Sequence, residues 1–170
     1  MDYFNPETKS SFRTINKIKT STHLKSGNGY FKCLTKGLAT NLNLKWSFVG
    51  RFLPKGNCEI ITMWDGIKFH EKIFYELVNT PCFKVKQNSD FYSCKSQLIK
   101  FFPNYSLARE WGVESYTGLP IFSSSGEVIG VLVVMDEKPL CSNLSCGLEN
   151  IIRFFSTFRR IHAQQPDRSA

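Results

Sequence analysis

The sequence contains no long apolar run and no apolar leader. No window approaches about 18 uninterrupted apolar residues, the length that a helix needs to cross a bilayer, so no membrane span is expected. The first 30 residues are polar and basic and lack the apolar core of a secretory signal. These two absences predict a cytoplasmic protein.

Closely spaced metal ligands are also absent. Six cysteines occur at irregular spacing without a Cys-x-x-Cys pair, and none of the three histidines neighbours a cysteine. A structural zinc site needs close ligand pairs, because one turn must present two donors to one ion. We therefore expect no metal, and we interpret the cysteines as reduced thiols that pack as small apolar residues. The cysteines are Cys33, Cys58, Cys82, Cys94, Cys141 and Cys146.

Acidic residues are too few to balance the basic ones, and the net charge is +8. Lysine and arginine gather in the first 25 residues and again near the other end, so the charge flanks the core and does not line a central groove. A basic excess can attract nucleic acid or anionic lipid. No Gly–aromatic RNA-binding signature or helix-turn-helix pattern accompanies it, so we favour solvated basic tails. Nucleic-acid binding through the basic termini stays open as an alternative.

What the sequence does contain is enough apolar material for one folded domain. The apolar fraction of 42% and the 15 phenylalanines argue against disorder, and the length suits a single core. Composition divides the chain into a basic polar arm (1–28), one domain (29–164) and a polar tail (165–170). Periodicity and turn residues predict a helix, three strands, an irregular segment with one short helix, two strands and a last helix. The expected ranges are 29–43, 46–53, 59–64, 67–77, 79–111 with a helix at 95–102, 115–122, 127–135 and 143–164.

The strand at 128–135 is apolar on both faces, which is unusual for the second strand of a hairpin. Two terminal helices can cover one face of the sheet together. The irregular segment 79–111 must then cover the other face, and such covers tend to leave concave sites. The sequence therefore predicts a binding site beneath this segment.

Several motifs together resemble a GAF domain of the type found in bacterial sensor proteins. The resemblance spans about residues 29–163, and its specific part is a hairpin of the form Gly-x-Pro-Ile followed by Gly-x-x-x-Gly-x-Leu. The motifs are Gly112–Ile121, Gly126–Asp136 and Lys138-Pro139-Leu140, with Asn79-Thr80-Pro81-Cys82 and Phe102-Pro103 upstream. The resemblance implies an α+β fold. It consists of an antiparallel sheet of five to six strands, terminal helices on one face, and loops with a short helix over a pocket on the other.

The resemblance leaves the ligand open, because GAF domains bind cyclic nucleotides, bilins, haem or small metabolites. The Asn-Lys-x-x-Phe-Asp-Glu pattern of the cyclic-nucleotide subgroup is absent. Bilin-attaching members place His after the attachment Cys, whereas Phe83 follows Cys82 and Lys95 follows Cys94 here. Haem would need a histidine in the pocket, and His70 is interpreted as a strand residue on a solvated face. No cofactor is therefore expected.

The leading hypothesis is a non-catalytic sensory or regulatory module that binds a small ligand or a protein partner. The alternative is a thiol enzyme similar to the free methionine-R-sulfoxide reductases, with Cys82 and Cys94 as the reacting pair. No third cysteine follows near the hairpin, so we expect no catalysis. Aromatic residues with polar tips and their strand neighbours are the candidate ligand-binding residues. They are Phe48, Trp64, Cys82, Tyr92, Tyr116 and Met135.

The last expected helix carries a seam of apolar residues at heptad spacing. Such a stripe either packs on the chain's own sheet or pairs with a second copy, and further apolar residues off the seam favour using both surfaces. The sequence therefore predicts a homodimer through the terminal helices. The seam residues are Leu144, Leu148, Ile151, Phe155 and Phe158.

Overall fold

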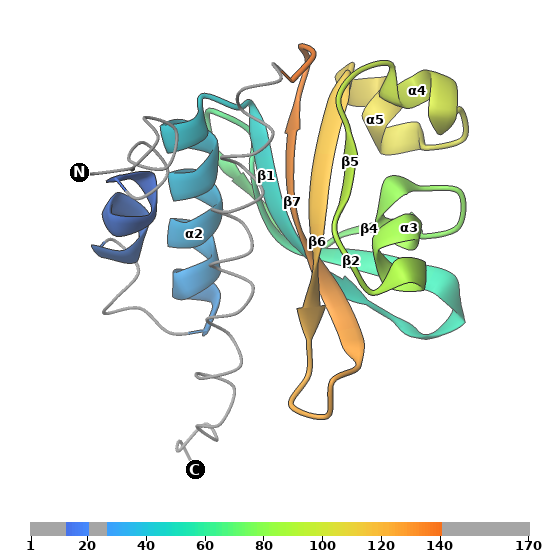
Figure 1. Ribbon diagram of the computed structural model, residues 1–170, viewed down its shortest axis with the longest axis horizontal. Helices are drawn as coiled ribbons and strands as arrows, with labels where there is room; N and C mark the ends of the chain where they lie inside the picture. Colours follow the sequence, from blue (N-terminus) through green and yellow to red (C-terminus); the bar gives the residue numbers. More distant parts are fainter. Residues whose placement is uncertain (1–12, 21–26, 141–170) are drawn as a thin grey trace, which may run out of the picture.

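The computed structural model describes residues 13–20 and 27–140, which form one antiparallel sheet with helices on both faces (Figure 1). In this part of the chain the sheet has seven strands in the order β3-β2-β1-β7-β6-β5, and β4 also pairs with β2. The strands are β1 (Trp46–Phe52), β2 (Asn57–Trp64), β3 (Phe69–His70), β4 (Ile73–Glu76), β5 (Tyr92–Cys94), β6 (Ser115–Phe122) and β7 (Val128–Asp136). The helices are α2 (Gly27–Leu42), α3 (Pro81–Asn88), α4 (Leu98–Phe101) and α5 (Ser106–Trp111), and a 3-10 turn, η1, spans Pro54–Gly56. The expected α+β class is confirmed.

The central strand β7 is covered on both faces, as its sequence predicts. Alternate residues of β7 enter two different cores, with Leu132 and Val134 toward α2 and Val131 and Val133 toward the opposite face. The helices within residues 79–111 lie over that opposite face, on the side of the sheet away from α2 (Figure 1), and β5 within the same segment joins the edge of the sheet. We call this segment, residues 79–111, the cover.

The helix α2 packs on the sheet through an apolar stripe. Its buried residues Phe31, Leu34, Leu38 and Leu42 recur at the three- and four-residue spacing of one helix face. Residues 13–20 are helical and reach the same core, where Ile18 is fully buried. This differs from the polar arm expected for residues 1–28. The approach is close, because a Cβ added at Gly37 would lie 3.2 Å from Ile18 Cγ1.

The cover is more regular than its composition indicated. The helix α3 begins after Thr80, whose side chain accepts a hydrogen bond from the Phe83 amide at 3.2 Å, and Pro81 occupies its first turn. These are the residues of the Asn79–Cys82 motif, where the sequence predicted only a break. The short helix expected at 95–102 corresponds to α4, whereas α3, α5 and β5 were not anticipated as separate elements.

The third expected strand, 67–77, is two short strands. Lys72 stands between β3 and β4 with φ +57°, which the extended conformation of a strand does not allow. This break and the unanticipated strand β5 together bring the sheet to seven strands, above the expected five to six. In the part of the chain that is described, no helix is long and apolar enough to cross a membrane. The last expected helix and its heptad seam fall outside the described residues.

Candidate functional site

A chain of buried polar groups lies between the sheet and α3. The hydroxyl of Tyr75 on β4 donates to Cys82 Sγ at 3.1 Å, and Cys82 Sγ lies 3.2 Å from the hydroxyl of Tyr116 on β6. Cys82 and Tyr116 are fully buried, and Tyr75 is 7% exposed. Cys58 is the cross-strand partner of Tyr75 in the sheet. These four side chains place two hydroxyl and two thiol groups within the apolar core under the cover.

Tyr105 completes this group from the start of α5, beside Tyr75, but its hydroxyl has no hydrogen-bond partner within 3.5 Å among the described residues. Its ring centroid lies 5.7 Å from that of Tyr75, and the residue is 2% exposed. Among the described residues, its hydroxyl and Thr62 Oγ1 are the buried side-chain oxygen atoms that lack a hydrogen bond. Thr62 pairs with Val49, which belongs to the α2 core, so only Tyr105 stands beneath the cover. An unpaired buried hydroxyl costs about 1–3 kcal/mol of stability.

All of these groups are protonated at neutral pH, and burial raises their pKa values further above it. Burial raises the pKa of the Cys82 thiol to about 11 and that of the Cys58 thiol to about 12. Burial also holds the pKa values of Tyr75, Tyr105 and Tyr116 well above the ordinary value for tyrosine. The cluster therefore offers neutral donors and acceptors and no thiolate.

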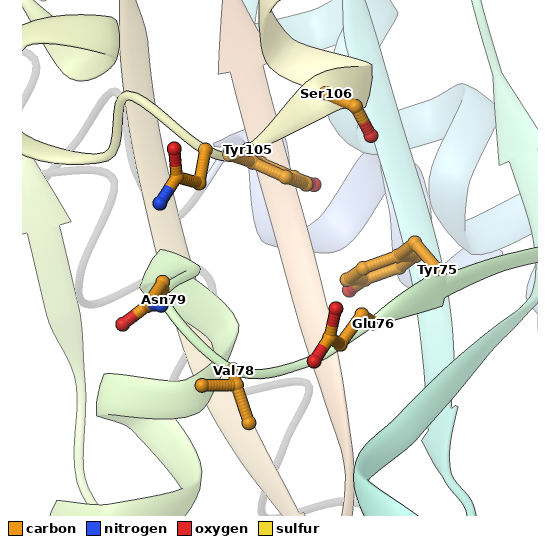
Figure 2. A pocket seen from close by; sticks show the side chains of 7 residues that line it. Tyr75, Glu76, Val78, Asn79, Tyr105 and Ser106 are labelled. Atoms are coloured by element: carbon orange, nitrogen blue, oxygen red, sulfur yellow. The ribbon is translucent and has the colours of Figure 1, made fainter.

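A hollow of about 320 Å³ opens beside Tyr75 and Tyr105, between the end of β4 and the start of α5 (Figure 2). We call it the tyrosine hollow. Four of its residues, Glu76, Asn79, Asn104 and Ser106, have polar side chains that make no hydrogen bond or ion pair within the described residues. Its lining is Tyr75, Glu76, Val78, Asn79, Asn104, Tyr105 and Ser106.

Two turns place this lining. After β4, the Leu77 amide donates to the Gly56 carbonyl at 2.8 Å, and Asn79 takes φ +60°, so the chain turns sharply into α3. On the other wall, the Tyr105 amide donates to the Phe102 carbonyl at 3.1 Å and the Arg109 guanidinium donates to the Pro103 carbonyl. Both turns are held by backbone carbonyls and not by the side chains of Glu76, Asn79, Asn104 and Ser106.

A second hollow, of about 520 Å³, lies between α5 and strands β1 to β3. We call it the tryptophan hollow, because Trp46 and Trp111 stack there with ring centroids 6.4 Å apart. The other lining residues are Lys45, Met63, Asp65, His70, Ile73, Leu107 and Glu110.

Most charges of the tryptophan hollow are already paired. Asp65 Oδ1 accepts hydrogen bonds from the Ile67 and Lys68 amides at 2.8 and 2.7 Å, and Asp65 Oδ2 lies 2.5 Å from His70 Nε2. Desolvation opposes ionisation of Asp65, but the hydrogen bonds from Lys68, His70 and Ile67 outweigh it and lower its pKa to about 2. Lys45 pairs with Glu137. His70, expected on a solvated face, is half-buried and serves this turn.

None of the six residues predicted from the sequence to bind a ligand lines either hollow. Phe48, Cys82, Tyr116 and Met135 are buried in the core beneath the cover, and Tyr92 is half-buried against it. These five are on the expected side of the sheet.

Trp64 is on the wrong side for the predicted site. Met63 is the register partner of Phe48 and shares its face, so the next residue along β2 points to the α2 face. There, Lys36 Nζ of α2 lies 4.5 Å from the Trp64 ring centroid. The sequence analysis missed Tyr75, Glu76 and Tyr105. The Asn79–Cys82 and Phe102-Pro103 motifs that flank them were the available signal.

Comparison with known families and structures agrees with this architecture. The family model of the GAF domain matches residues 32–157, and no curated protein matches the chain. A putative GAF sensor protein from Burkholderia vietnamiensis is 15% identical with a TM-score of 0.70, covering 95% of this chain and 100% of that one. The nlh2 GAF domain of A. aeolicus in an inactive state is 16% identical with a TM-score of 0.68, covering 91% and 96%.

An enzyme also shares the fold. The free methionine-R-sulfoxide reductase of Neisseria meningitidis, solved in complex with its substrate, is 13% identical with a TM-score of 0.68. The similarity covers 97% of this chain and 98% of that one. At such identities the similarity concerns the fold alone.

Proposed function

Because this chain belongs to the GAF domain family, we propose that it is a non-catalytic sensory or regulatory module whose small ligand binds in the tyrosine hollow. The observation that carries the proposal is the unpaired, buried hydroxyl of Tyr105 in the wall of that hollow. A buried polar group without a partner is costly, and a bound ligand would remove that cost. The hydroxyl is closed off from solvent, so a ligand reaches it by separating the β4–α3 turn from the start of α5.

The tyrosine hollow suits this role better than the tryptophan hollow. In the tryptophan hollow, Asp65 and His70 bond to each other and Asp65 also accepts from the adjoining turn, so these groups are already used in hydrogen bonds within the protein. In the tyrosine hollow, the carboxylate of Glu76 and the amides of Asn79 and Asn104 remain unengaged within the described residues. Small-molecule sites combine aromatic side chains with a few polar groups that orient the ligand, and the tyrosine hollow offers both kinds of group.

Signalling would pass through the sheet to the terminal helices. The hollow begins at the end of β4, which pairs with β2, and β2 packs against α2 on the opposite face. The contact between Lys36 and Trp64 is part of that packing. A ligand that shifts β4 therefore has a short, packed route to α2, and the proposal includes a homodimer through the terminal helices as the output.

The state of the cysteines supports a role without catalysis. A reductase mechanism needs an accessible thiolate, because the thiolate is the nucleophile. Cys82 is fully buried with a pKa raised to about 11, and burial also raises the pKa of Cys94, which is 7% exposed. Both thiols are therefore held in the unreactive form at neutral pH.

Native mass spectrometry of the purified full chain tests the proposal, and it reports retained ligand and oligomeric state together. We expect a retained small molecule that is lost in Tyr105→Phe and kept in Tyr92→Phe. Tyr92 is the matched control, because it loses the same atom from a tyrosine that lines neither hollow. A ligand that survives Tyr105→Phe would move the site elsewhere. The proposal would be overturned if the purified chain retains no ligand and if adding metabolite mixtures does not raise its thermal stability.

A further inference from the structure

The lining of the tyrosine hollow indicates what kind of ligand it takes. We infer that the hollow binds a small organic cation, through an ammonium or guanidinium group. This inference rests on the proposed function, because it concerns the same site. It adds a chemical class that neither the fold nor the family provides.

The charge of the lining carries the inference. Glu76 is the only ionisable side chain among the seven residues apart from the two tyrosines, and no lysine or arginine lines the hollow. The sign of this lining is opposite to that of the whole chain, which has 22 basic and 14 acidic residues. A phosphate or carboxylate ligand would meet a carboxylate and the negative faces of two rings, without a compensating cation. The lining therefore disfavours anions.

The hydrogen-bonding groups of the lining favour a donor-rich ligand. An ammonium has three N–H donors and no acceptor, so it needs several oxygen atoms around it. Glu76 supplies a carboxylate, Asn79 and Asn104 supply amide carbonyls, and the Tyr105 hydroxyl accepts as well. Burial raises the pKa of Tyr105, so this hydroxyl stays neutral and does not become a competing charge.

The two aromatic rings add a second source of affinity for a cation. The rings of Tyr75 and Tyr105 both border the hollow and pack against each other, with centroids 5.7 Å apart and planes inclined by 45° (Figure 2). A cation within about 6 Å of a ring centroid is attracted by the ring quadrupole. The chain uses this contact elsewhere, because Lys36 Nζ lies 4.5 Å from the Trp64 ring centroid and Lys45 Nζ lies 4.6 Å from that of Trp46. No protein cation occupies the tyrosine rings in this way within the described residues.

Two basic side chains on the helices that flank the hollow are engaged in other contacts. Arg109 is the basic residue of α5, and its guanidinium donates to the Pro103 carbonyl. Lys86, in the last turn of α3, lies 5.3 Å from the ring centroid of Phe52. A ligand cation therefore does not compete with these side chains for Glu76. The volume of about 320 Å³ is near the lower end of ligand sites, which indicates a small molecule.

A charge series of one molecular size tests the inference. The probes are benzylamine, benzyl alcohol and benzoate, which differ in charge at neutral pH and little in shape. Each is titrated into the ¹⁵N-labelled full chain while the side-chain amide signals of Asn79 and Asn104 are followed by NMR. We expect benzylamine to shift these signals, and benzyl alcohol and benzoate to shift them less or not at all.

Two variants assign the effect. Glu76→Gln should weaken benzylamine binding about two- to fivefold and leave benzyl alcohol unaffected, as expected for a partly exposed ion pair. Glu127→Gln is the matched control, because it removes an exposed carboxylate at the β6–β7 turn and should change nothing. Equal weakening by both variants would mean that net charge, and not the hollow, attracts the probe, and it would overturn the inference.

The outcomes separate this inference from the proposed function. If benzoate or benzyl alcohol binds as tightly as benzylamine, and Tyr105→Phe weakens that binding, the hollow is a ligand site but the cation class is wrong. If none of the three probes shifts the Asn79 and Asn104 signals, both the cation class and the ligand site in this hollow are overturned. Shifts confined to the tryptophan hollow, read at the Trp111 indole, would also overturn both.

Discussion

Tyr75 and Tyr105 face the same hollow with ring centroids 5.7 Å apart, yet only the Tyr75 hydroxyl is hydrogen-bonded, to Cys82. The two residues are alike in type, burial and elevated pKa. They differ in what their hydroxyls contact. This difference separates a tyrosine that stabilises the core from the one that we propose as a ligand contact.

The two tyrosines should therefore respond differently to loss of the hydroxyl. We expect Tyr75→Phe to lower the free energy of unfolding by about 1 kcal/mol, because it removes the hydrogen bond to Cys82. Tyr105→Phe should leave it unchanged or raise it by up to about 1 kcal/mol, because an unpaired buried hydroxyl is lost. Urea unfolding of the ligand-free protein measures both. A loss of more than 1 kcal/mol in Tyr105→Phe would show that its hydroxyl is satisfied in solution.

Alkylation should distinguish the cysteines by burial. Cys58 and Cys82 are fully buried and have pKa values raised to about 12 and about 11, so their thiolate fraction at pH 8 is very small. Cys33 on α2 is partly exposed. We expect iodoacetamide to modify Cys33 in the native protein and to spare Cys58 and Cys82 until urea is added. Peptide mapping by mass spectrometry reads each site, and rapid native modification of Cys82 would reopen the thiol-enzyme alternative.

The parts of the fold that the sequence predicted are those where pattern and packing coincide. The doubly apolar run at 128–135 required cover on both faces, and the stripe Phe31, Leu34 and Leu38 provided one of them. The hairpin of β6 and β7 was readable because a polar turn separates two long apolar strands. In these segments, burial follows from periodicity alone.

The candidate site was less predictable, because it depends on the sheet register and on two turns. Trp64 was assigned to the wrong face, since a shift of one residue along a strand exchanges the faces. Tyr105 reaches the hollow because hydrogen bonds to the carbonyls of Phe102 and Pro103 fix the chain before α5. Such contacts cannot be predicted from the periodicity of the sequence. Lys72 breaks the third expected strand because it takes a left-handed conformation, which a lysine in the sequence does not predict.

The homodimer stays a prediction, because the heptad seam at Leu144, Leu148, Ile151, Phe155 and Phe158 lies outside the described residues. We expect the wild-type chain to sediment as a dimer and Phe155→Glu or Phe158→Glu to sediment as a monomer, since a charge in the seam cannot be buried without a partner. Sedimentation equilibrium measures this. A wild-type chain that sediments as a monomer would contradict the homodimer prediction. A dimer that both variants leave intact would place the interface elsewhere.

Asp65 should make stability depend on acid pH through the turn between β2 and β3. Hydrogen bonds from the Lys68 amide, His70 and the Ile67 amide lower its pKa in the folded protein from 3.8 to about 2. A carboxyl with a lowered folded pKa contributes stability that is present above its unfolded pKa and is lost as the pH falls through the folded value. Asp65→Asn should therefore destabilise the protein by about 1–2 kcal/mol at neutral pH.

The difference between wild type and Asp65→Asn should shrink as the pH falls from about 4 to about 2, because the wild-type carboxylate is then protonated as well. Urea unfolding across this range measures it, with Glu127→Gln as a control carboxylate that lies exposed at a turn. If the difference in unfolding free energy between wild type and Asp65→Asn stays constant down to pH 2, the charge of Asp65 contributes nothing. The variant would then be less stable only because the Asn amide does not fit the hydrogen bonds of this turn.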